Sequence, residues 1–210
     1  VLTPEEALLI ARPGDVLAGE RGSQRLPGFD LGNSPREFTR QRVGGKRVIL
    51  STTNGTKTLL AARGAKRVLV GSLLNLKAVA QELSRGDGEI KLLCSGTRGR
   101  FSLEDTLCAG GIIDRLLGDG WGKAEPIVPE ARAQIPPRVS LDDLAYAALF
   151  LYQREQSLPQ MLALGVNGND LKKLGLEEDV AYCAQEDILD LCPEYRGGEV
   201  VISQRSGRCD

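Results

Sequence analysis

The chain has 210 residues, of which 41% are hydrophobic and 26% charged, as in an ordinary globular protein of one large or two small domains. The 27 basic and 28 acidic residues leave a formal net charge of −1, which argues against a nucleic-acid-binding protein held by a broad basic face. The chain contains no histidine, which excludes a Ser-His-Asp triad or a His-bearing zinc site within it. Acid–base or metal chemistry must therefore come from carboxylate, Cys, Lys, Tyr or backbone groups.

The five cysteines include no C-x-x-C pair, and an odd number of separated cysteines does not predict a disulfide framework. No apolar run is long enough to span a membrane, and the N-terminus does not look like a signal peptide. These observations predict a reduced, cytoplasmic protein that does not bind a membrane. The chain opens without Met, on residues that read like the end of a strand, so we expect it to be incomplete at its start.

Short β-branched runs alternate with helical segments over the first 120 residues. Helices are expected over residues 4–11, 55–62, 75–83 and 102–117, the first of them capped by Thr3 and ended by Pro13-Gly14. Strands are expected over 16–19, 46–51, 67–70 and 89–94, and a long Gly- and Pro-containing loop over 21–35. This order predicts an α/β fold, a layered α/β/α arrangement around a mainly parallel sheet.

The pattern changes after Trp121. Residues 124–138 contain Pro126, Pro129, Pro136 and Pro137, which indicates a linker or a surface excursion. Helices are expected over 140–154, 158–164 and 171–174, while 180–183 and 199–202 fit either strands or turns. We therefore divide the chain into an N-terminally incomplete α/β core, 1–123, and a helical or mixed C-terminal part, 124–210, that completes the same fold.

Loops rich in Gly and small polar residues follow the predicted strands. Ligands of open α/β sheets bind at the C-terminal ends of strands, where backbone N–H groups and hydroxyls suit a phosphate or another oxyanion. Each loop taken alone is also explained by turn formation and helix capping. Several loops at one sheet edge favour binding, with the candidate substrate contacts Arg21, Asn33, Thr53, Asn54, Thr56, Thr97, Arg100 and Ser102.

Carboxylates accompany these loops. Glu104 and Asp105 directly follow Ser102, where they fit the first turn of a helix, or equally a Mg²⁺ site, because Mg²⁺ prefers carboxylates and substrate oxygens. Glu20, beside a strand end, is the third candidate for catalysis or metal binding, and Asp30 is a fourth carboxylate.

Cys94 has the bare Cys-x5-Arg spacing of cysteine phosphatases, ending at Arg100. Its internal glycines are displaced and Leu93 stands where those enzymes carry histidine. We predict that Cys94 is a packing residue, with a thiolate nucleophile as the alternative.

The chain resembles the 2-phosphosulfolactate phosphatase, or ComB-like, family over nearly its whole length. The resemblance is carried by segments such as PGFDLGNSP and GRFSLEDTLCAG, which belong to the matching stretches 19–22, 27–35, 52–56, 70–75, 94–97, 99–110 and 174–185. It implies a Mg²⁺-dependent α/β phosphatase that converts 2-phospho-3-sulfolactate to 3-sulfolactate and phosphate, a step of coenzyme M biosynthesis. Two departures stand out: residues 165–168 are less typical, and the family's opening strand with its Asp-Val-Leu-Arg-Ala-Thr-Thr-Thr segment is missing, about 40 residues.

The resulting hypothesis is a Mg²⁺-dependent phosphatase for a small anionic phosphorylated substrate, using Glu104 and Asp105 first and Glu20 next. The alternatives are a phosphatase for another small phosphorylated 2-hydroxy acid, or a non-catalytic anion-binding or assembly protein on the same fold. A wide apolar helical face, which includes Leu141, Leu144 and Leu149, fits core packing for most of its residues. It also supports a homodimer with residues 124–165 in the contact.

Overall fold

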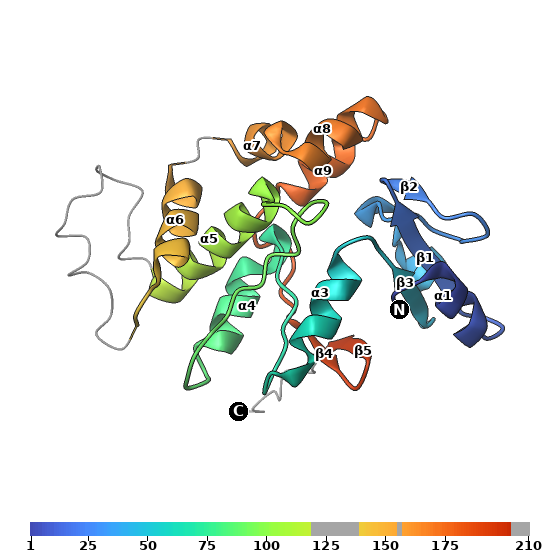
Figure 1. Ribbon diagram of the computed structural model, residues 1–210, viewed down its shortest axis with the longest axis horizontal. Helices are drawn as coiled ribbons and strands as arrows, with labels where there is room; N and C mark the ends of the chain where they lie inside the picture. The colour runs from blue at the N-terminus through green and yellow to red at the C-terminus, as the bar shows by residue number, and fades with distance from the viewer. Residues whose placement is uncertain (119–138, 155–156, 203–210) are drawn as a thin grey trace.

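The computed structural model describes residues 1–118, 139–154 and 157–202, with a sheet near the N-terminus at one end of the molecule and helices forming most of the rest (Figure 1). The strands are β1 Val16–Arg21, β2 Gln24–Arg25, β3 Val48–Ser51, β4 Pro193–Arg196 and β5 Glu199–Ile202. The α-helices are α1 Pro4–Ile10, α2 Arg40–Val43, α3 Gly55–Ala61, α4 Leu76–Leu83, α5 Leu103–Leu117, α6 Asp143–Gln153, α7 Leu158–Leu164, α8 Val166–Lys173 and α9 Glu177–Cys183. Short 3-10 helices are η1 Pro35–Glu37, η2 Ala62–Gly64 and η3 Leu73–Asn75.

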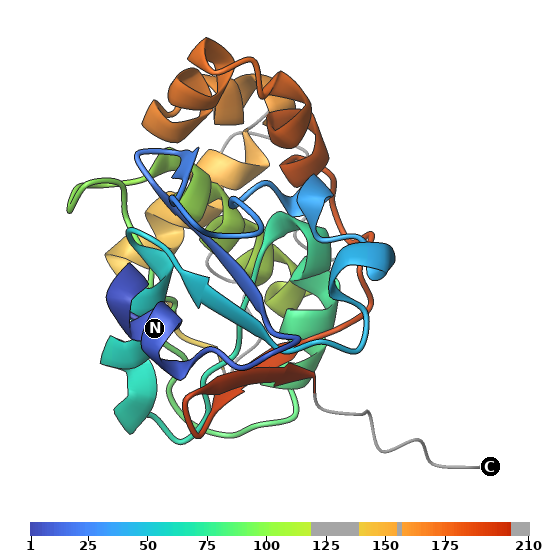
Figure 2. The ribbon, with the colours of Figure 1, turned by 90° about the vertical axis from the view of Figure 1, so that its right-hand side faces the viewer.

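β1 is the central strand of the N-terminal sheet, whose order is β2-β1-β3. It runs parallel to β3, with Gly19 opposite Ser51, and the two strands lie side by side in Figure 2. The chain then turns through Gly22 and Ser23, both at positive φ, into the antiparallel β2. Paired positive φ values are typical of tight hairpin turns, which match the twist of the flanking strands. The hairpin fixes where the last residues of β1 stand.

Small apolar clusters hold this sheet together. One joins α1 to the sheet through Ala7, Leu26, Phe29 and Ile49. A second contains Val16, Ala18 and Leu31. The burial of these side chains removes apolar surface from water and fixes the sheet against α1.

α5 is the central helix of the larger part. Leu107, in the second turn of α5, is 0% exposed and packs in one cluster with Leu76 of α4, Leu162 of α7 and Val180 of α9. The opposite side of α5 packs against α6, through a second cluster that includes Ala109, Ile113, Ala148 and Leu149. α5 is therefore enclosed by helices that come from both halves of the chain.

Two glycines allow α6 and α4 to approach α5 closely. A Cβ on Gly110 would overlap the carbonyl oxygen of Ala148 and would lie 2.7 Å from Cβ of Tyr152. A Cβ on Gly111 would lie 2.8 Å from a methyl carbon of Leu76. The backbones of α5 and α6 thus touch at a point where any side chain would force them apart.

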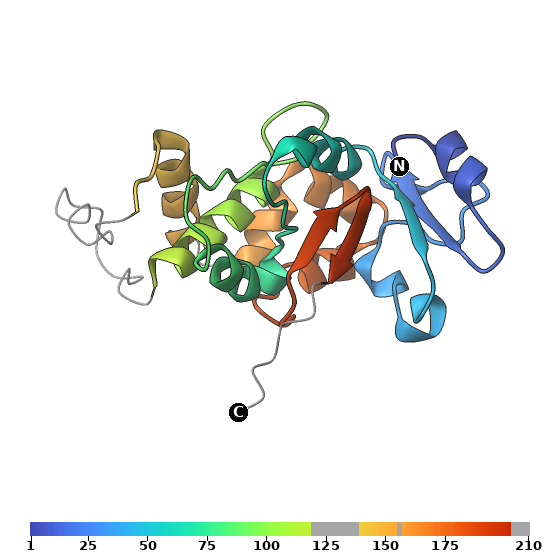
Figure 3. The same ribbon diagram turned by 90° about the horizontal axis from the view of Figure 1, so that it is seen from below.

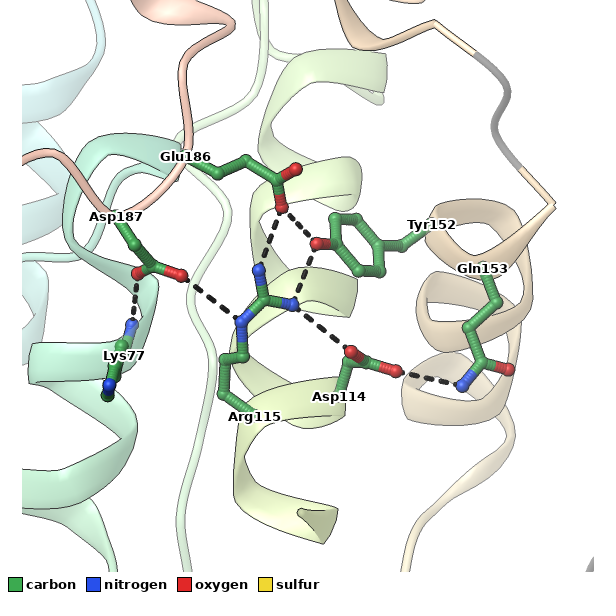
Figure 4. Close-up of polar contacts among 7 residues, drawn as sticks. All are labelled: Lys77, Asp114, Arg115, Tyr152, Gln153, Glu186 and Asp187. Carbon is green, nitrogen blue, oxygen red and sulfur yellow. Dashed lines mark hydrogen bonds and ion pairs between the residues drawn. The ribbon is translucent and has the colours of Figure 1, made fainter. Parts of the chain in front are cut away.

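A polar network attaches the segment after α9 to this helical core (Figure 4). The guanidinium of Arg115 donates to Asp114 at 3.1 Å, Glu186 at 2.9 Å, Asp187 at 3.2 Å and the Tyr152 hydroxyl at 2.8 Å. Tyr152 in turn donates to Glu186. Burial of the Tyr152 hydroxyl raises its pKa, and the bond to Glu186 raises it further. These partners occupy the Arg115 guanidinium, so Arg115 has a structural role and is not available to bind a ligand.

The last part of the described chain forms the β4–β5 hairpin, seen from below in Figure 3. Leu69 forms an isolated antiparallel bridge with Glu194 of β4. Arg67 links Glu194 to Glu82 of α4, at 3.1 and 2.8 Å. The hairpin is held to the segment before α4 by these contacts.

The helices expected from the sequence are confirmed for the most part. Thr3 caps α1 by accepting a hydrogen bond from Glu6 N, and α3 to α7 form close to their predicted bounds. The expected helix over 171–174 is the end of the longer α8. Residues 180–183 belong to α9, so both earlier alternatives, strand and turn, are wrong there.

Two of the predicted strands are wrong. Residues 67–70 form only the bridge at Leu69, and residues 89–94 form no strand. Their apolar runs have strand propensity, but a strand also requires a hydrogen-bonded neighbour along its length, which local sequence does not specify. The expected loop over 21–35 in turn contains the short strand β2.

The expected fold class is supported at its coarser level, a mixed α/β protein with a helical C-terminal part. The described strands form a three-stranded mixed sheet and a two-stranded hairpin, not one large parallel sheet between two helical layers. The boundary at 123 and the linker expected over 124–138 lie outside the described residues. None of the helices in the described ranges is long and apolar enough to cross a membrane.

The apolar face of α6 packs mostly into the core, as predicted for most of its residues. Ala148, Leu149 and Tyr152 are buried, and Leu141 and Ala145 are partly buried against the cluster that contains Ala148 and Leu149. Only Leu144 points away from it, at 80% exposure.

The close approach of α5 and α6 predicts that Gly110→Ala destabilises the protein by about 3 kcal/mol, since the added methyl meets backbone that cannot rotate away. Urea unfolding measures this change in the free energy of unfolding. Gly64→Ala is the matched control, because a Cβ at Gly64 meets nothing within 4 Å; we expect a change within about 0.5 kcal/mol there. Equal effects of the two substitutions would contradict the proposed contact.

Candidate functional site

Glu20 stands at the end of β1 and is 9% exposed. Its Oε1 accepts a hydrogen bond from Thr53 N at 2.8 Å, and its Oε2 accepts one from Ser23 N at 3.1 Å. The carboxylate therefore joins the β1–β2 turn to the loop between β3 and α3. Both carboxylate oxygens accept hydrogen bonds from backbone N–H groups, so Glu20 has a structural role.

Arg21 binds oxygens of the protein around the same strand end. Its guanidinium donates to the carbonyl of Glu20 at 2.7 Å, to that of Leu2 at 3.1 Å and to the Ser51 hydroxyl at 3.1 Å. These partners are neutral, so the positive charge of Arg21 stays uncompensated by them. Its predicted role as an anion clamp stays a prediction.

The loop from Thr52 to Thr56 follows β3. Thr56 is buried and donates its hydroxyl to the carbonyl of Thr52 at 3.0 Å, so it serves the turn itself. Asn54 stands at the N-cap of α3 without a side-chain cap bond. Among the described residues the Thr53 hydroxyl oxygen is buried without a hydrogen-bond partner, an uncommon and costly state.

A tight turn at residues 97–100 precedes α5. Thr97 and Arg100 exchange two backbone hydrogen bonds, both of 3.0 Å. Arg98 and Gly99 between them have φ values of 55° and 72°. The left-handed conformation is costly for arginine, and Arg98 forms an ion pair of 2.7 Å with Asp170 of α8. Arg100 is exposed, and within the described ranges its guanidinium has no hydrogen bond or ion pair.

The first turn of α5 carries the two neighbouring carboxylates. Ser102 caps the helix by accepting from Asp105 N at 3.2 Å, and its hydroxyl donates to Glu104 at 3.0 Å. Glu104 also accepts a long bond of 3.4 Å from Gly168 N. One oxygen of Asp105 accepts from Gly96 N at 2.7 Å, whereas the other has no hydrogen bond among the described residues. The helix-start interpretation is confirmed.

The three candidate metal ligands do not gather into one cluster. In the described part of the chain no group of three or more Cys, Asp or Glu side chains is placed to hold a metal ion. Glu104 and Asp105 remain adjacent on α5, whereas Glu20 is engaged at the end of β1. Any Mg²⁺ site here would use one or two protein carboxylates, as is common when phosphate oxygens complete the coordination.

Two side chains that contact the candidate loops were not predicted from the sequence. Asn167 of α8 donates to the Thr97 hydroxyl at 3.0 Å. Asp179 of α9 accepts from the Ser34 hydroxyl at 2.8 Å, next to the exposed Asn33. Their only sequence signal is that Asn167 lies between Gly165 and Gly168, and Asp179 within an acidic helix start.

Cys94 is exposed on the loop before α5, so its predicted packing in the core is wrong, because the strand expected to bury it does not form. Partial burial of the thiol raises its pKa, and the Asp105 carboxylate raises it further. Burial likewise raises the pKa of Cys108 to about 12. A raised pKa lowers the thiolate fraction at neutral pH, the opposite of what a nucleophilic cysteine requires.

Comparison with known proteins shows that the chain is similar to phosphatases. The family model described as 2-phosphosulpholactate phosphatase matches residues 1–198. A protein of Symbiobacterium thermophilum named "Probable 2-phosphosulfolactate phosphatase" is 38% identical over 208 residues, covering 96% of this chain and 82% of its own length. Proteins of the same name from Caldanaerobacter subterraneus and Caldicellulosiruptor saccharolyticus are 37% and 36% identical, covering 95% and 91% of this chain and 78% and 76% of their own lengths.

The matched proteins are named as phosphatases that act on a phosphate ester, which makes them phosphoric monoester hydrolases. The chain belongs to the 2-phosphosulpholactate phosphatase family. The resemblance carried by the loop motifs is thereby confirmed.

The raised pKa of Cys94 predicts slower alkylation by iodoacetamide at pH 7 than for a free thiol, with a rate that rises with pH as the thiolate forms, because only the thiolate reacts. Mass spectrometry of the Cys94 peptide measures this rate. We also expect Cys94→Ala to keep most of the turnover, with Cys94→Ser as the matched variant. Fast alkylation at pH 7 together with loss of turnover in both variants would identify a nucleophile instead.

Proposed function

We propose that this protein is a phosphatase that hydrolyses 2-phosphosulfolactate to sulfolactate and phosphate. The observation that carries the proposal is the family match over residues 1–198, supported by relatives of that name at up to 38% identity over most of their length. The coenzyme M pathway as its setting, and a cytoplasmic location, are further parts of the proposal.

The named substrate combines a phosphate ester, a sulfonate and a carboxylate, so a binding site needs cationic and N–H donors. Arg100 suits this task, since its guanidinium is exposed and unpaired within the described ranges while Arg98 is bound to Asp170. A guanidinium fork matches the geometry of tetrahedral oxyanions. The candidate contacts Thr53, Asn54 and Thr97 lie on the loops already described.

Asp105 is the carboxylate that we place at the reacting centre. Both oxygens of Glu20 and of Glu104 accept hydrogen bonds from the protein, whereas Asp105 keeps one oxygen without such a donor among the described residues. In the reaction, water attacks phosphorus and the bond from phosphorus to the lactate oxygen breaks. The proton lost by water passes to a base, and the leaving alkoxide takes up a proton.

A Mg²⁺ requirement is the finer part of the proposal. Glu104 and Asp105, adjacent on the first turn of α5, are the residues that would hold the ion together with phosphoryl oxygens. When bound, Mg²⁺ would neutralise charge on the phosphoryl group as the ester breaks.

Phosphate release from 2-phosphosulfolactate tests the function and the metal requirement together. We expect turnover with added Mg²⁺, loss of turnover with EDTA, and recovery on Mg²⁺ addition. Turnover that is unaffected by EDTA would refute the metal requirement and leave Asp105 as a base. Asp105→Asn should lower kcat by about a hundredfold, the low end of a general acid–base contribution.

The assay also separates the alternative functions. Other phosphorylated 2-hydroxy acids are measured in parallel, and a higher kcat/KM for one of them would replace the proposed substrate. Calorimetry with sulfolactate and phosphate tests for binding without turnover, which would favour the non-catalytic anion-binding or assembly protein.

The exposed guanidinium on the 97–100 turn predicts that Arg100→Ala raises KM by about tenfold, because hydrogen bonds to charged groups contribute about 1.5–3 kcal/mol. Arg100→Lys keeps the charge but loses the fork, and should recover only part of the affinity. Arg63→Ala, which removes an exposed arginine of η2, is the matched control and should leave KM unchanged. An unchanged KM in Arg100→Ala would contradict this role.

The homodimer stays a proposal. Leu144, the exposed apolar residue of α6, lies within the segment 124–165 proposed for the contact, part of which lies outside the described residues.

A further inference from the structure

Asp179 is a buried carboxylate that the proposed reaction does not use. It lies in the first turn of α9 and is 3% exposed. It accepts a hydrogen bond of 2.8 Å from the Ser34 hydroxyl, and the Arg36 guanidinium approaches to 3.9 Å. The Ser34 hydroxyl, the Arg36 cation and the N-terminal end of α9 all stabilise the buried charge, so this carboxylate ties α9 to the segment that holds Ser34.

Asn167 makes the corresponding contact from α8. Its side-chain amide donates at 3.0 Å to the hydroxyl of Thr97, a residue that is only 4% exposed. The same helix contacts this turn again through the Arg98–Asp170 ion pair, and it contacts the start of α5 through the hydrogen bond from Gly168 N to Glu104. Thus α8 contacts both the 97–100 turn and the start of α5.

The two contacts have a common design. In each, a side chain of the α8–α9 pair binds a loop hydroxyl, Ser34 in the segment 32–37 or Thr97 in the segment 96–102. The two loops are far apart in sequence, whereas α8 and α9 are joined by only Leu174, Gly175 and Leu176. One short helical pair therefore fixes two candidate anion-binding loops relative to each other.

We propose that Asn167 and Asp179 are positioning residues that hold these two loops for one substrate. This inference rests on the proposed function, in which the loops bind the anionic groups. Loops held in the binding geometry lower the ordering cost of substrate binding. Loss of either contact weakens binding without touching the reacting atoms, so KM rises while kcat stays the same.

The test compares Asn167→Ala and Asp179→Ala with two neighbours on the same helices. Asn169→Ala removes an exposed amide of α8. Glu177→Gln removes an exposed carboxylate of α9. We expect KM to rise about fivefold in each positioning variant, the loss of one hydrogen bond, and to stay unchanged in both controls.

Amide hydrogen exchange without substrate provides a second measurement that does not depend on turnover. We expect faster exchange in 32–37 for Asp179→Ala and in 96–102 for Asn167→Ala, with the protection of α5 unchanged. Each loop should respond to its own partner alone. The double mutants Asn167→Ala/Thr97→Val and Asp179→Ala/Ser34→Ala should exchange no faster than the single variants, because each pair shares one contact.

The outcomes separate the inference from the proposed function. If the unmodified protein does not hydrolyse 2-phosphosulfolactate, the proposed function fails, while loop-specific exchange still supports the positioning contacts. If exchange and KM stay unchanged, or if α5 loosens as much as the loops, the inference is overturned. Where Asp179→Ala does not fold, Asn167→Ala and its control decide the same question for the other loop.

Discussion

The enclosure of α5 is the constraint on which the rest of the structure depends. Its core residue Leu107 touches helices before and after it in sequence, and Gly110 brings α6 to backbone contact. A helix held on several sides has little freedom to shift, because protein interiors are close-packed. Its first turn, with Ser102, Glu104 and Asp105, is therefore a rigid platform for the candidate site. The Arg115 network adds the segment after α9 to the same support.

Charged groups in this protein divide into those bound by the protein and those left available. Arg115 faces three carboxylates, Arg98 is paired with Asp170, and Glu20 holds two backbone amides. Arg100 and one oxygen of Asp105 stay outside such pairs within the described ranges. A site for a multiply charged ester needs a cation and a carboxylate that are not already paired within the protein. Groups that are already neutralised contribute little to the binding of a ligand.

Local patterns predicted the parts of this structure that are set by neighbours in sequence. The cap at Ser102 and the acidic first turn of α5 follow from residues three positions apart, and they form as expected. The strand expected over 89–94 failed because pairing depends on a partner strand that its own residues do not specify. Glu20 was singled out by sequence, but its partner Thr53 was not foreseeable, and neither were Asn167 and Asp179, whose partners lie far along the chain.

The separation of these partners affects when the site forms. Ser34 and Asp179 are 145 residues apart, and Thr97 and Asn167 are 70 apart. During synthesis the N-terminal sheet and α5 leave the ribosome well before α8 and α9, because chains emerge in order at about 5–20 residues per second. For several seconds the growing chain thus carries both loops without their anchors. The contacts that we propose for positioning the two loops therefore form only after α8 and α9 have been synthesised, and α9 also completes the core around α5.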